Sequence, residues 1–178
     1  MSKKDVIIVE SPSKIKTLQK FLGDEYIIEA SVGHIRDLPK KNLGLDIDDD
    51  FKTTYEISPD SIKTVKKLKD SLKNANNLYL ATDPDREGEA ISWHIIDELK
   101  PKIPIKRLVF NEITKSAIKN ALKETRELDM NLVDAQECRR ILDRLFGFLI
   151  SKKLWTNIKG GLSAGRVQSP AVKILVDR

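Results

Sequence analysis

Residues 78–91 read LYLATDPDREGEAI, and they hold the clearest change from strand to helix in the sequence. Its apolar first part gives way at Asp83 to acidic residues at alternate positions, and the pattern then becomes helical. A short apolar run that leads directly into a helix is typical of a strand-to-helix junction in an α/β protein. We therefore predict a strand over Asn77–Thr82 and a helix over Arg86–Leu99, which ends before Pro101.

Strands and helices alternate in this way along residues 1–125. Apolar runs rich in β-branched residues predict strands over residues 5–10, 26–32, 77–82 and 106–110. Helices are predicted over residues 12–22, 60–74 and 86–99, and a further helix begins at Thr114. Residues 34–59 lack regular periodicity and are predicted as a long loop. Such alternation favours a four-stranded, mainly parallel sheet covered by helices on both faces, so the expected fold class is α/β.

The pattern becomes wholly helical beyond the α/β part. Residues 131–150 carry apolar side chains at three- and four-residue steps, which predicts a long helix. Residues 159–165 are a glycine-rich break, and residues 169–178 predict another helix. We therefore predict an α/β domain over residues 1–125 and a helical segment over residues 131–178 that begins a following domain.

The composition is that of a soluble protein with a highly charged surface. Charged residues make up 33% of the 178 residues, hydrophobic residues make up 40%, and the formal net charge is +5. This positive charge permits an anionic partner such as nucleic acid without requiring one. The single cysteine, Cys138, excludes an internal disulfide, and no apolar run is long enough for a signal peptide or a membrane span. The expectation is a cytoplasmic protein without a membrane partner.

Acidic residues stand where the third predicted strand ends. Asp83, Asp85 and Glu87 alternate there, and Glu10 ends the first predicted strand. Ligands of open α/β sheets bind beyond the carboxyl ends of the strands, so neighbouring first and third strands would place Glu10 opposite the aspartates. Clustered carboxylates repel one another unless a cation lies between them. Mg²⁺ suits the arrangement, because it prefers oxygen ligands, keeps several waters and needs only one or two direct carboxylates.

The same acidic string has a simpler explanation. Acidic residues are favoured in the first turn of a helix, so Asp83, Asp85 and Glu87 would equally form a solvated turn that opens the helix. Glu89 is predicted to lie on that helix and to face away from the other acids. The residues alone leave the metal site and the solvated turn open as alternatives.

Basic residues near the strand ends fit an anionic substrate. Lys14 lies in the first turn of the helix that follows Glu10, where backbone N–H groups favour phosphate. His34 and Arg36 follow the second predicted strand. Each residue taken alone is explained equally well as a surface charge, and their shared position beyond strand ends is what favours a binding role.

The long predicted helix is charged on one or two of its faces. Arg139, Arg140, Asp143 and Arg144 lie within AQECRRILDRLFG. At helical spacing they form ion pairs with one another, or Asp143 orients an arginine toward a phosphate. Both interpretations are compatible with the sequence.

The glycine-rich break continues into the last predicted helix, and residues 161–170 read GLSAGRVQSP. Its small residues allow a backbone or a phosphate to approach closely, and Ser163, Arg166 and Gln168 offer hydrogen-bond donors at the start of the last helix. An ordinary turn that connects two helices is the alternative.

Six segments, in this order, resemble the N-terminal part of the bacterial DNA topoisomerase I family, which are type IA topoisomerases. They are VIIVESPSKIKTLQKFLG (6–23), SVGHIRDLP (31–39), ATDPDREGEAISWHI (81–95), VFNEIT (109–114), AQECRRILDRLFGF (135–148) and GLSAGRVQSPAV (161–172). The resemblance covers essentially the whole chain, and the combination of segments is highly specific. It implies that the α/β part has the toprim fold, a Rossmann-like fold shared with primases and some nucleases.

The resemblance also implies an activity. Members of this family relax negatively supercoiled DNA without ATP and with Mg²⁺ as the cofactor. A tyrosine attacks one strand and forms a 5′-phosphotyrosyl link, the other strand passes through the gap, and the break is resealed. The implied partners are a single-stranded segment of negatively supercoiled DNA and the remaining domains of the enzyme, and the implied location is the cytoplasm, in association with the nucleoid.

Residue roles follow from position in the matching segments. Glu10 matches the family's general acid/base glutamate, Lys14 its phosphate-contacting lysine and Arg166 an arginine near the scissile phosphate, and these three are the expected catalytic residues. The expected metal-binding residues are Glu10, Asp83, Asp85 and Glu87. The expected DNA-binding residues are His34, Arg36, Arg139, Arg140, Asp143, Arg144, Ser163 and Gln168.

The chain departs from the family in one respect. The family's catalytic tyrosine lies in a later domain with an arginine soon after it, whereas this chain has only Tyr26, Tyr55 and Tyr79, and none matches that motif. The chain taken alone is therefore expected to be inactive. Two alternatives remain, a stand-alone toprim nuclease or primase-like enzyme, which would not need residues 131–178, and a binding module whose carboxylates are structural.

Overall fold

The computed structural model describes residues 3–178, so the first two residues of the predicted domain 1–125 lie outside the described range. The chain folds as two compact units, the first made of residues up to 37 together with 56–135, and the second of residues 38–55 together with 136–178. This packing differs from the division at residues 125–131 that the sequence predicts, because residues 38–55 pack with the second unit.

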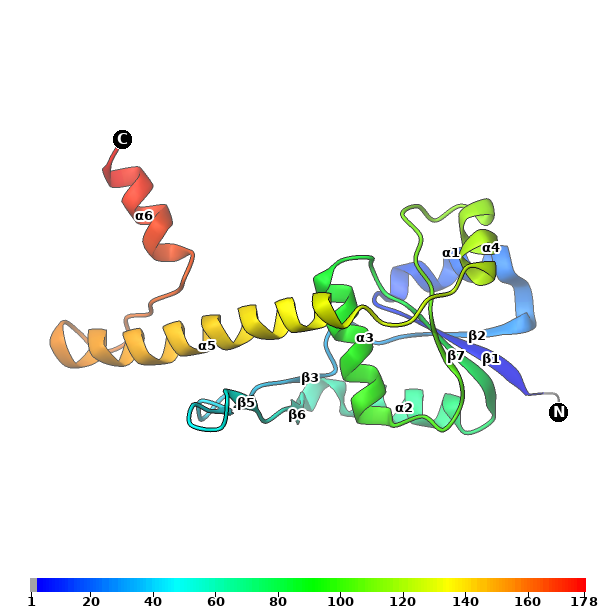
Figure 1. Ribbon diagram of the computed structural model, residues 1–178, viewed down its shortest axis with the longest axis horizontal. Helices are drawn as coiled ribbons and strands as arrows, with labels where there is room; N and C mark the ends of the chain where they lie inside the picture. The colour runs from blue at the N-terminus through cyan, green and yellow to red at the C-terminus, as the bar shows by residue number, and fades with distance from the viewer. Residues whose placement is uncertain (1–2) are drawn as a thin grey trace. The chain divides into compact units, whose positions relative to one another are not determined.

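The first unit contains the four-stranded parallel sheet that the sequence predicts (Figure 1). Its strands are β1 (Lys4–Val9), β2 (Tyr26–Ala30), β7 (Ala75–Ala81) and β8 (Ile105–Arg107). They lie in the order β2-β1-β7-β8, and every neighbouring pair is parallel. The expected α/β fold class is therefore confirmed. The central position of β1 and β7 follows from their burial on both faces of the sheet.

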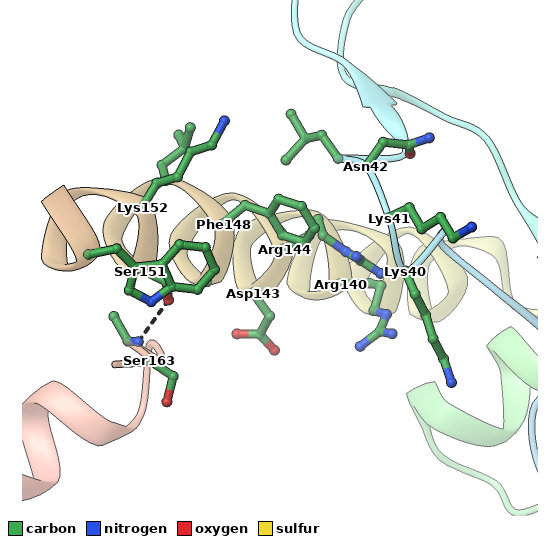
Figure 2. A pocket seen from close by; sticks show the side chains of 15 residues that line it. Lys40, Lys41, Asn42, Arg140, Asp143, Arg144, Phe148, Ser151, Lys152 and Ser163 are labelled. Carbon is green, nitrogen blue, oxygen red and sulfur yellow. Dashed lines mark hydrogen bonds between the residues drawn. The ribbon is translucent and has the colours of Figure 1, made fainter. Parts of the chain in front are cut away.

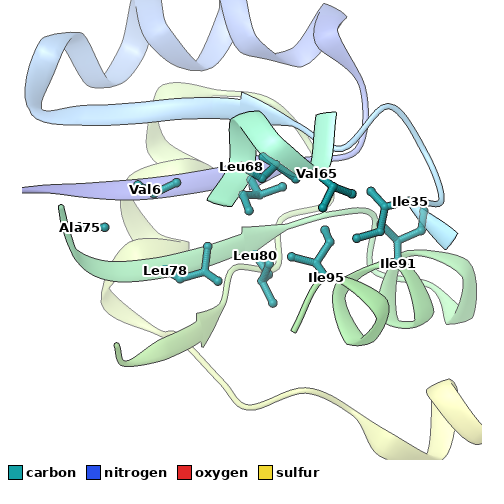
Figure 3. Packing of buried hydrophobic residues seen from close by; sticks show 10 residues of the cluster. Val6, Ile35, Val65, Leu68, Ala75, Leu78, Leu80, Ile91 and Ile95 are labelled. Carbon is teal, nitrogen blue, oxygen red and sulfur yellow. The ribbon is translucent and has the colours of Figure 1, made fainter. Parts of the chain in front are cut away.

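Helices cover both faces of this sheet. They are α1 (Pro12–Leu22), α2 (Ile62–Leu72), α3 (Arg86–Leu99) and α4 (Lys115–Lys123), with short 3₁₀ turns at Gly23–Glu25 and Pro59–Ser61. Alternate residues of β1 point to opposite faces. Val6 and Ile8 belong to the same buried cluster as residues of α2 and α3 (Figure 3), whereas Ile7 and Val9 cluster with residues of α1 and α4.

Local signals set the helix ends as expected. The Ser11 side chain accepts a hydrogen bond from the Ser13 backbone at 3.3 Å, Pro12 begins α1, and Gly23 follows it with a φ of 65°. Thr114 caps α4 by accepting from the Ala117 backbone at 3.3 Å. These polar caps satisfy backbone N–H groups that have no partner within the helix.

Strand ends and the long loop differ from the sequence prediction. The second strand ends at Ala30 rather than Val32, because Val32 and Gly33 have positive φ angles of 60° and 81°. The fourth strand covers Ile105–Arg107 rather than residues 106–110.

Residues 34–59 are not irregular throughout. They contain two antiparallel pairs of two-residue strands, β3 (Arg36–Asp37) with β6 (Glu56–Ile57), and β4 (Leu45–Asp46) with β5 (Lys52–Thr53). Strands of two residues are too short to show a period of two in the sequence, which is why the pattern did not predict them.

The second unit is built on one long helix and the loop beside it. Helix α5 (Met130–Asn157) runs beyond the predicted residue 150, and its first residues belong to the first unit. Arg144 of α5 donates to the carbonyl oxygens of Leu38 and Pro39 at 3.1 and 2.9 Å. The Tyr55 hydroxyl lies 2.6 and 2.7 Å from the two carboxylate oxygens of Glu137. Both ends of the loop are thereby held on α5.

The last helix, α6 (Gln168–Val176), exposes most of its apolar side chains. These are Val172, Ile174, Leu175 and Val176. Within residues 3–178, none of the helices has both the length and the apolar character needed to cross a membrane.

Candidate active site

The acidic residues follow two neighbouring parallel strands. Val9 is paired with Ala81, so β1 and β7 end side by side. Glu10 comes directly after β1, and Asp83 comes two residues after the end of β7. The sheet therefore brings the beginning of both loops to the same edge, as the order of strands and helices predicts.

Each of the three alternating acids has its own partner in the first unit. Asp83 forms an ion pair with Lys14. Glu87 lies 2.5 Å from Nε2 of His34. The Asp85 side chain accepts from the Gly88 backbone N–H at 2.8 Å and so caps α3. Asp85 therefore does open the helix as a cap, while Asp83 and Glu87 each lie beside a basic side chain.

The donor set fits a Mg²⁺ ion held largely by water. Within the described residues 3–178, no three His, Cys, Asp or Glu side chains lie close enough together to enclose a metal ion. Carboxylate oxygens are nevertheless the ligands that Mg²⁺ prefers, and one or two of them are sufficient. Asp83 and Asp85 both line a cavity of about 530 Å³, whereas Glu10 and Glu87 are not among its lining residues. Two carboxylates are sufficient for such an ion, and their role as ligands stays a prediction.

Lys14, a predicted site residue, lines the same cavity. Asn111 and Glu112, which follow the fourth strand, also line it, and the sequence did not predict them as site residues. Three neighbouring strands, β1, β7 and β8, therefore contribute side chains beyond their carboxyl ends. The rule that pointed to Glu10 and Asp83 would also have found Asn111 and Glu112, had it been applied to the fourth strand.

His34 and Arg36 are engaged inside the first unit. Nε of Arg36 donates to Nδ1 of His94 at 2.8 Å, and its guanidinium lies 5.1 Å from the ring of Trp93. A terminal nitrogen of Arg36 also lies 2.5 Å from an oxygen of Asp97. Arg36 is nearly buried, whereas His34 is one-third exposed beside Glu87. Their predicted contacts with DNA remain predictions.

A large groove lies in the second unit, between α5, the loop before β4 and the glycine-rich turn (Figure 2). Its volume is about 980 Å³. Of the predicted DNA-binding residues, it is lined by Arg140, Asp143, Arg144 and Ser163. The Ala164 backbone donates to the Ser151 hydroxyl at 2.9 Å, which fixes the turn against α5.

Cationic and aromatic residues that the sequence analysis missed also line this groove. They are Lys40, Lys41, Lys152, Phe148 and Trp155. Lys40 and Lys41 belong to the segment predicted as a loop of the α/β domain, so nothing in their pattern related them to the long helix. The guanidinium of Arg144 lies 5.1 Å from the Phe148 ring, within the range of a cation–π contact.

Asp143 is the centre of a small ion-pair group. Its two oxygens lie 2.6 Å from Nε of Arg166 and 3.7 Å from Nε of Arg139. The hydrogen bond to Asp143 raises the pKa of the Arg166 guanidinium, which therefore stays charged. Asp143 therefore makes an ion pair at helical spacing, as the first interpretation expects, and it also bonds an arginine from the glycine-rich segment. The orientation of an arginine toward a phosphate stays a prediction.

Known protein families match both parts of the chain. The toprim domain family matches residues 5–113, and the DNA topoisomerase family matches residues 127–178. The chain is 53% identical over 186 residues to DNA topoisomerase 1 of Streptomyces coelicolor. This match covers 97% of the chain and 20% of that relative. It is 51% identical over 187 residues to DNA topoisomerase 1 of Mycobacterium tuberculosis, with the same coverages of 97% and 20%. The chain belongs to the bacterial DNA topoisomerase I family.

A solved structure in this family confirms the expected toprim fold. The full-length topoisomerase I from Thermotoga maritima matches with a TM-score of 0.89 and 48% sequence identity, covering 98% of this chain and 30% of that one. The chain spans 20% of the length of the DNA topoisomerase 1 relatives.

Gly88 gives a test of how closely the acidic loop is packed. A Cβ at Gly88 would overlap the carbonyl oxygen of Asp83 and lie 2.8 Å from its backbone nitrogen, whereas a Cβ at Gly160 would meet nothing within 4 Å. We predict that Gly88→Ala lowers the free energy of unfolding by about 1–3 kcal/mol, the usual cost of overpacking. Gly160→Ala, the matched control, is expected to change it by less than about 0.5 kcal/mol. Denaturant unfolding measures both, and equal stability of the two variants would contradict the prediction.

Proposed function

We propose that this chain supplies the acidic Mg²⁺ site and part of the single-strand binding surface of a type IA topoisomerase that relaxes negatively supercoiled DNA. The observation that carries the proposal is the ion pair of Lys14 with Asp83 beyond the adjacent ends of β1 and β7, in a chain of the topoisomerase I family. Glu10 is the first residue after β1. Acting on chromosomal DNA, the enzyme would work in the cytoplasm at the nucleoid.

The chemistry proposed for the site uses residues on two loops of the first unit. Asp83 and Asp85, together with Glu87 and Glu10, are the residues that would hold Mg²⁺. When bound, Mg²⁺ brings positive charge to the phosphodiester. Glu10 transfers a proton to or from the oxygen that leaves or re-enters during cleavage and resealing. Lys14, beside Asp83, binds a phosphate oxygen when the strand displaces it from that carboxylate.

The groove of the second unit is the proposed site for a single strand. Lys40, Lys41 and Arg140 line it with positive charge that suits a phosphate backbone. Phe148 and Trp155 offer flat faces on which bases stack without preference for sequence. Arg166, which Asp143 orients, keeps donors on its terminal nitrogens for the phosphate to be cut. Arg139 and Gln168 are proposed to assist along the same strand.

None of the three tyrosines suits nucleophilic attack on DNA. Tyr26 and Tyr79 pack edge to face with ring centroids 6.3 Å apart, and burial raises the pKa of both hydroxyls. Burial and the hydrogen bond to Glu137 raise the pKa of Tyr55 further. A hydroxyl with a raised pKa is a poorer nucleophile at neutral pH. The attacking tyrosine is therefore proposed to come from the remaining domains of the enzyme.

The Mg²⁺ assignment predicts a specific loss of binding. Changing Asp83→Asn together with Asp85→Asn removes two negative charges, while asparagine at position 85 still caps α3. We expect this double variant to lose the heat of Mg²⁺ binding in calorimetric titration of the chain. Asp49→Asn, in the exposed acidic run of the loop, is the control and should titrate like the unchanged chain. Equal titration of the double variant would contradict the assignment.

The groove assignment predicts binding to single-stranded DNA that weakens as salt rises. Each lost phosphate contact flattens the plot of log affinity against log salt by about 0.7. We expect Lys41→Ala with Arg140→Ala to bind more weakly and to flatten this slope by about 1.4, since two contacts are lost. Lys102→Ala with Lys123→Ala, which removes the same charge from exposed positions of the first unit, is the control. Fluorescence anisotropy at several salt concentrations measures both, and an unchanged slope in the groove variant would speak against the assignment.

The tyrosine argument predicts that the chain alone forms no covalent link to DNA. Incubation with supercoiled plasmid, single-stranded DNA and Mg²⁺ should yield neither relaxed topoisomers nor protein–DNA adducts after denaturation. A tyrosine-linked adduct would refute the proposal. Metal-dependent cutting without an adduct would instead support a toprim nuclease, an alternative that the match of residues 127–178 to topoisomerases disfavours.

A further inference from the structure

A carboxylate and a guanidinium are buried together behind the acidic loop. Glu89 of α3 is 0% exposed and Arg107, the last residue of β8, is 1% exposed. Nε of Arg107 donates to a Glu89 oxygen at 2.9 Å. Burial lowers the pKa of Arg107, and Glu89 counteracts this by favouring the charged form. Burying two charges is costly, so a buried pair is weak grounds for a purely stabilising role.

The remaining donors of Arg107 reach the backbone around the end of β7. One terminal nitrogen donates to the carbonyl oxygens of Leu80 and Leu108 at 2.9 and 2.7 Å. The other donates to the carbonyl oxygen of Asp83 at 2.8 Å. A single planar guanidinium therefore joins two strands to the first residue of the acidic loop, which a lysine could not do.

Gly88 packs closely against the same peptide group. Its missing side chain lets the first turn of α3 approach Asp83 so closely that a Cβ would overlap the Asp83 carbonyl oxygen. The Asp83 carbonyl is thus fixed between Arg107 and α3. Because Asp83, Asp85 and Glu87 follow one another at alternate positions, fixing this peptide group limits where all three carboxylates can lie.

Glu89 is in turn held by the segment that leads into α5. The oxygen that binds Arg107 also accepts from Arg126 at 2.7 Å, and the other oxygen accepts from the Asp129 backbone at 3.1 Å. Both carboxylate oxygens therefore have partners, and the position of Glu89 does not depend on a metal ion or on DNA.

We propose that Arg107, oriented by Glu89, is a positioning residue of the Mg²⁺ site, which sets the backbone of the acidic loop before the metal binds. The inference rests on the proposed function for the identity of the ion. Residues that orient metal ligands typically change metal affinity by about tenfold to a hundredfold when they are altered. Arg107 acts through the Asp83 backbone, and it contacts neither the metal nor the substrate.

The test is Arg107→Lys, which keeps the positive charge beside Glu89 and loses the planar set of donors. Calorimetric titration with Mg²⁺ should show a dissociation constant about tenfold to a hundredfold higher than that of the unchanged chain. Amide hydrogen exchange of the metal-free chain should show faster exchange at Gly88, whose N–H is bonded to Asp85. Glu89→Gln, which keeps one acceptor oxygen, should shift both readouts in the same direction by less.

Val65→Ala is the control, because it removes buried apolar volume from α2 and touches no residue of the acidic loop. It should lower the melting temperature while leaving Mg²⁺ affinity and the relative exchange of Gly88 unchanged. If the Gly88 amide exchanges as slowly in Arg107→Lys as in the unchanged chain, the inference is overturned, whether or not Mg²⁺ binds. An equal Mg²⁺ affinity of the two chains would also overturn it. Absence of any Mg²⁺ response in the unchanged chain would overturn the proposed function instead.

Discussion

The pairing of β1 with β7 is the constraint on which the rest of the structure depends. These two strands are distant in sequence, and they pair in parallel at the centre of the sheet, with a register shift between Lys4 and Val6 and continuous pairing from Val6 to Val9. Because both are buried on both faces, helices must cover the sheet from two directions. The loops that follow the two strands then have to leave at the same edge. The neighbourhood of Lys14 and Asp83 is a consequence of this pairing, and no separate interaction is needed to bring the loops together.

The first unit has partly exposed charged side chains at the edge of its sheet and a buried ion pair beneath them. At the edge of the sheet, Asp83 forms an ion pair with Lys14, and Glu87 lies within hydrogen-bond distance of His34. The side chains of Lys14 and His34 remain partly exposed to solvent and can exchange partners. One layer deeper, the carboxylate of Glu89 has no access to solvent and is fully satisfied by the protein. Ion pairs of the first kind contribute little to stability, whereas breaking a buried pair leaves an uncompensated charge. The outer pairs therefore suit a site that must accept a new ligand, and the inner pair suits a fixed support.

The sequence predicted features that depend on near neighbours in the chain. Ser11 and Thr114 marked helix starts because capping is a local interaction, and the alternation of strands and helices was sufficient for the parallel sheet. Features that depend on distant partners were missed. Nothing in the pattern around Lys40 relates it to α5, and nothing around Glu89 in α3 shows that an arginine from β8 pairs with it. The edge of the sheet at which Glu10 and Asp83 stand follows from a rule of the fold, because both come just after neighbouring parallel strands. The ion pair of Asp83 with Lys14 depends instead on side-chain geometry.

The short pairing of β3 with β6 has a consequence for how this family can change over time. Arg36 and Asp37 pair with Ile57 and Glu56, so the loop between them leaves and re-enters the first unit at neighbouring points. Lengthening a loop whose ends are already held together costs only about 0.6 kcal/mol for each doubling of its length. Insertions and deletions in residues 38–55 are therefore tolerated by the α/β sheet, although this loop carries Lys40 and Lys41. The surface proposed to bind the strand can therefore diversify among descendants of one ancestor while the residues at the edge of the sheet stay the same.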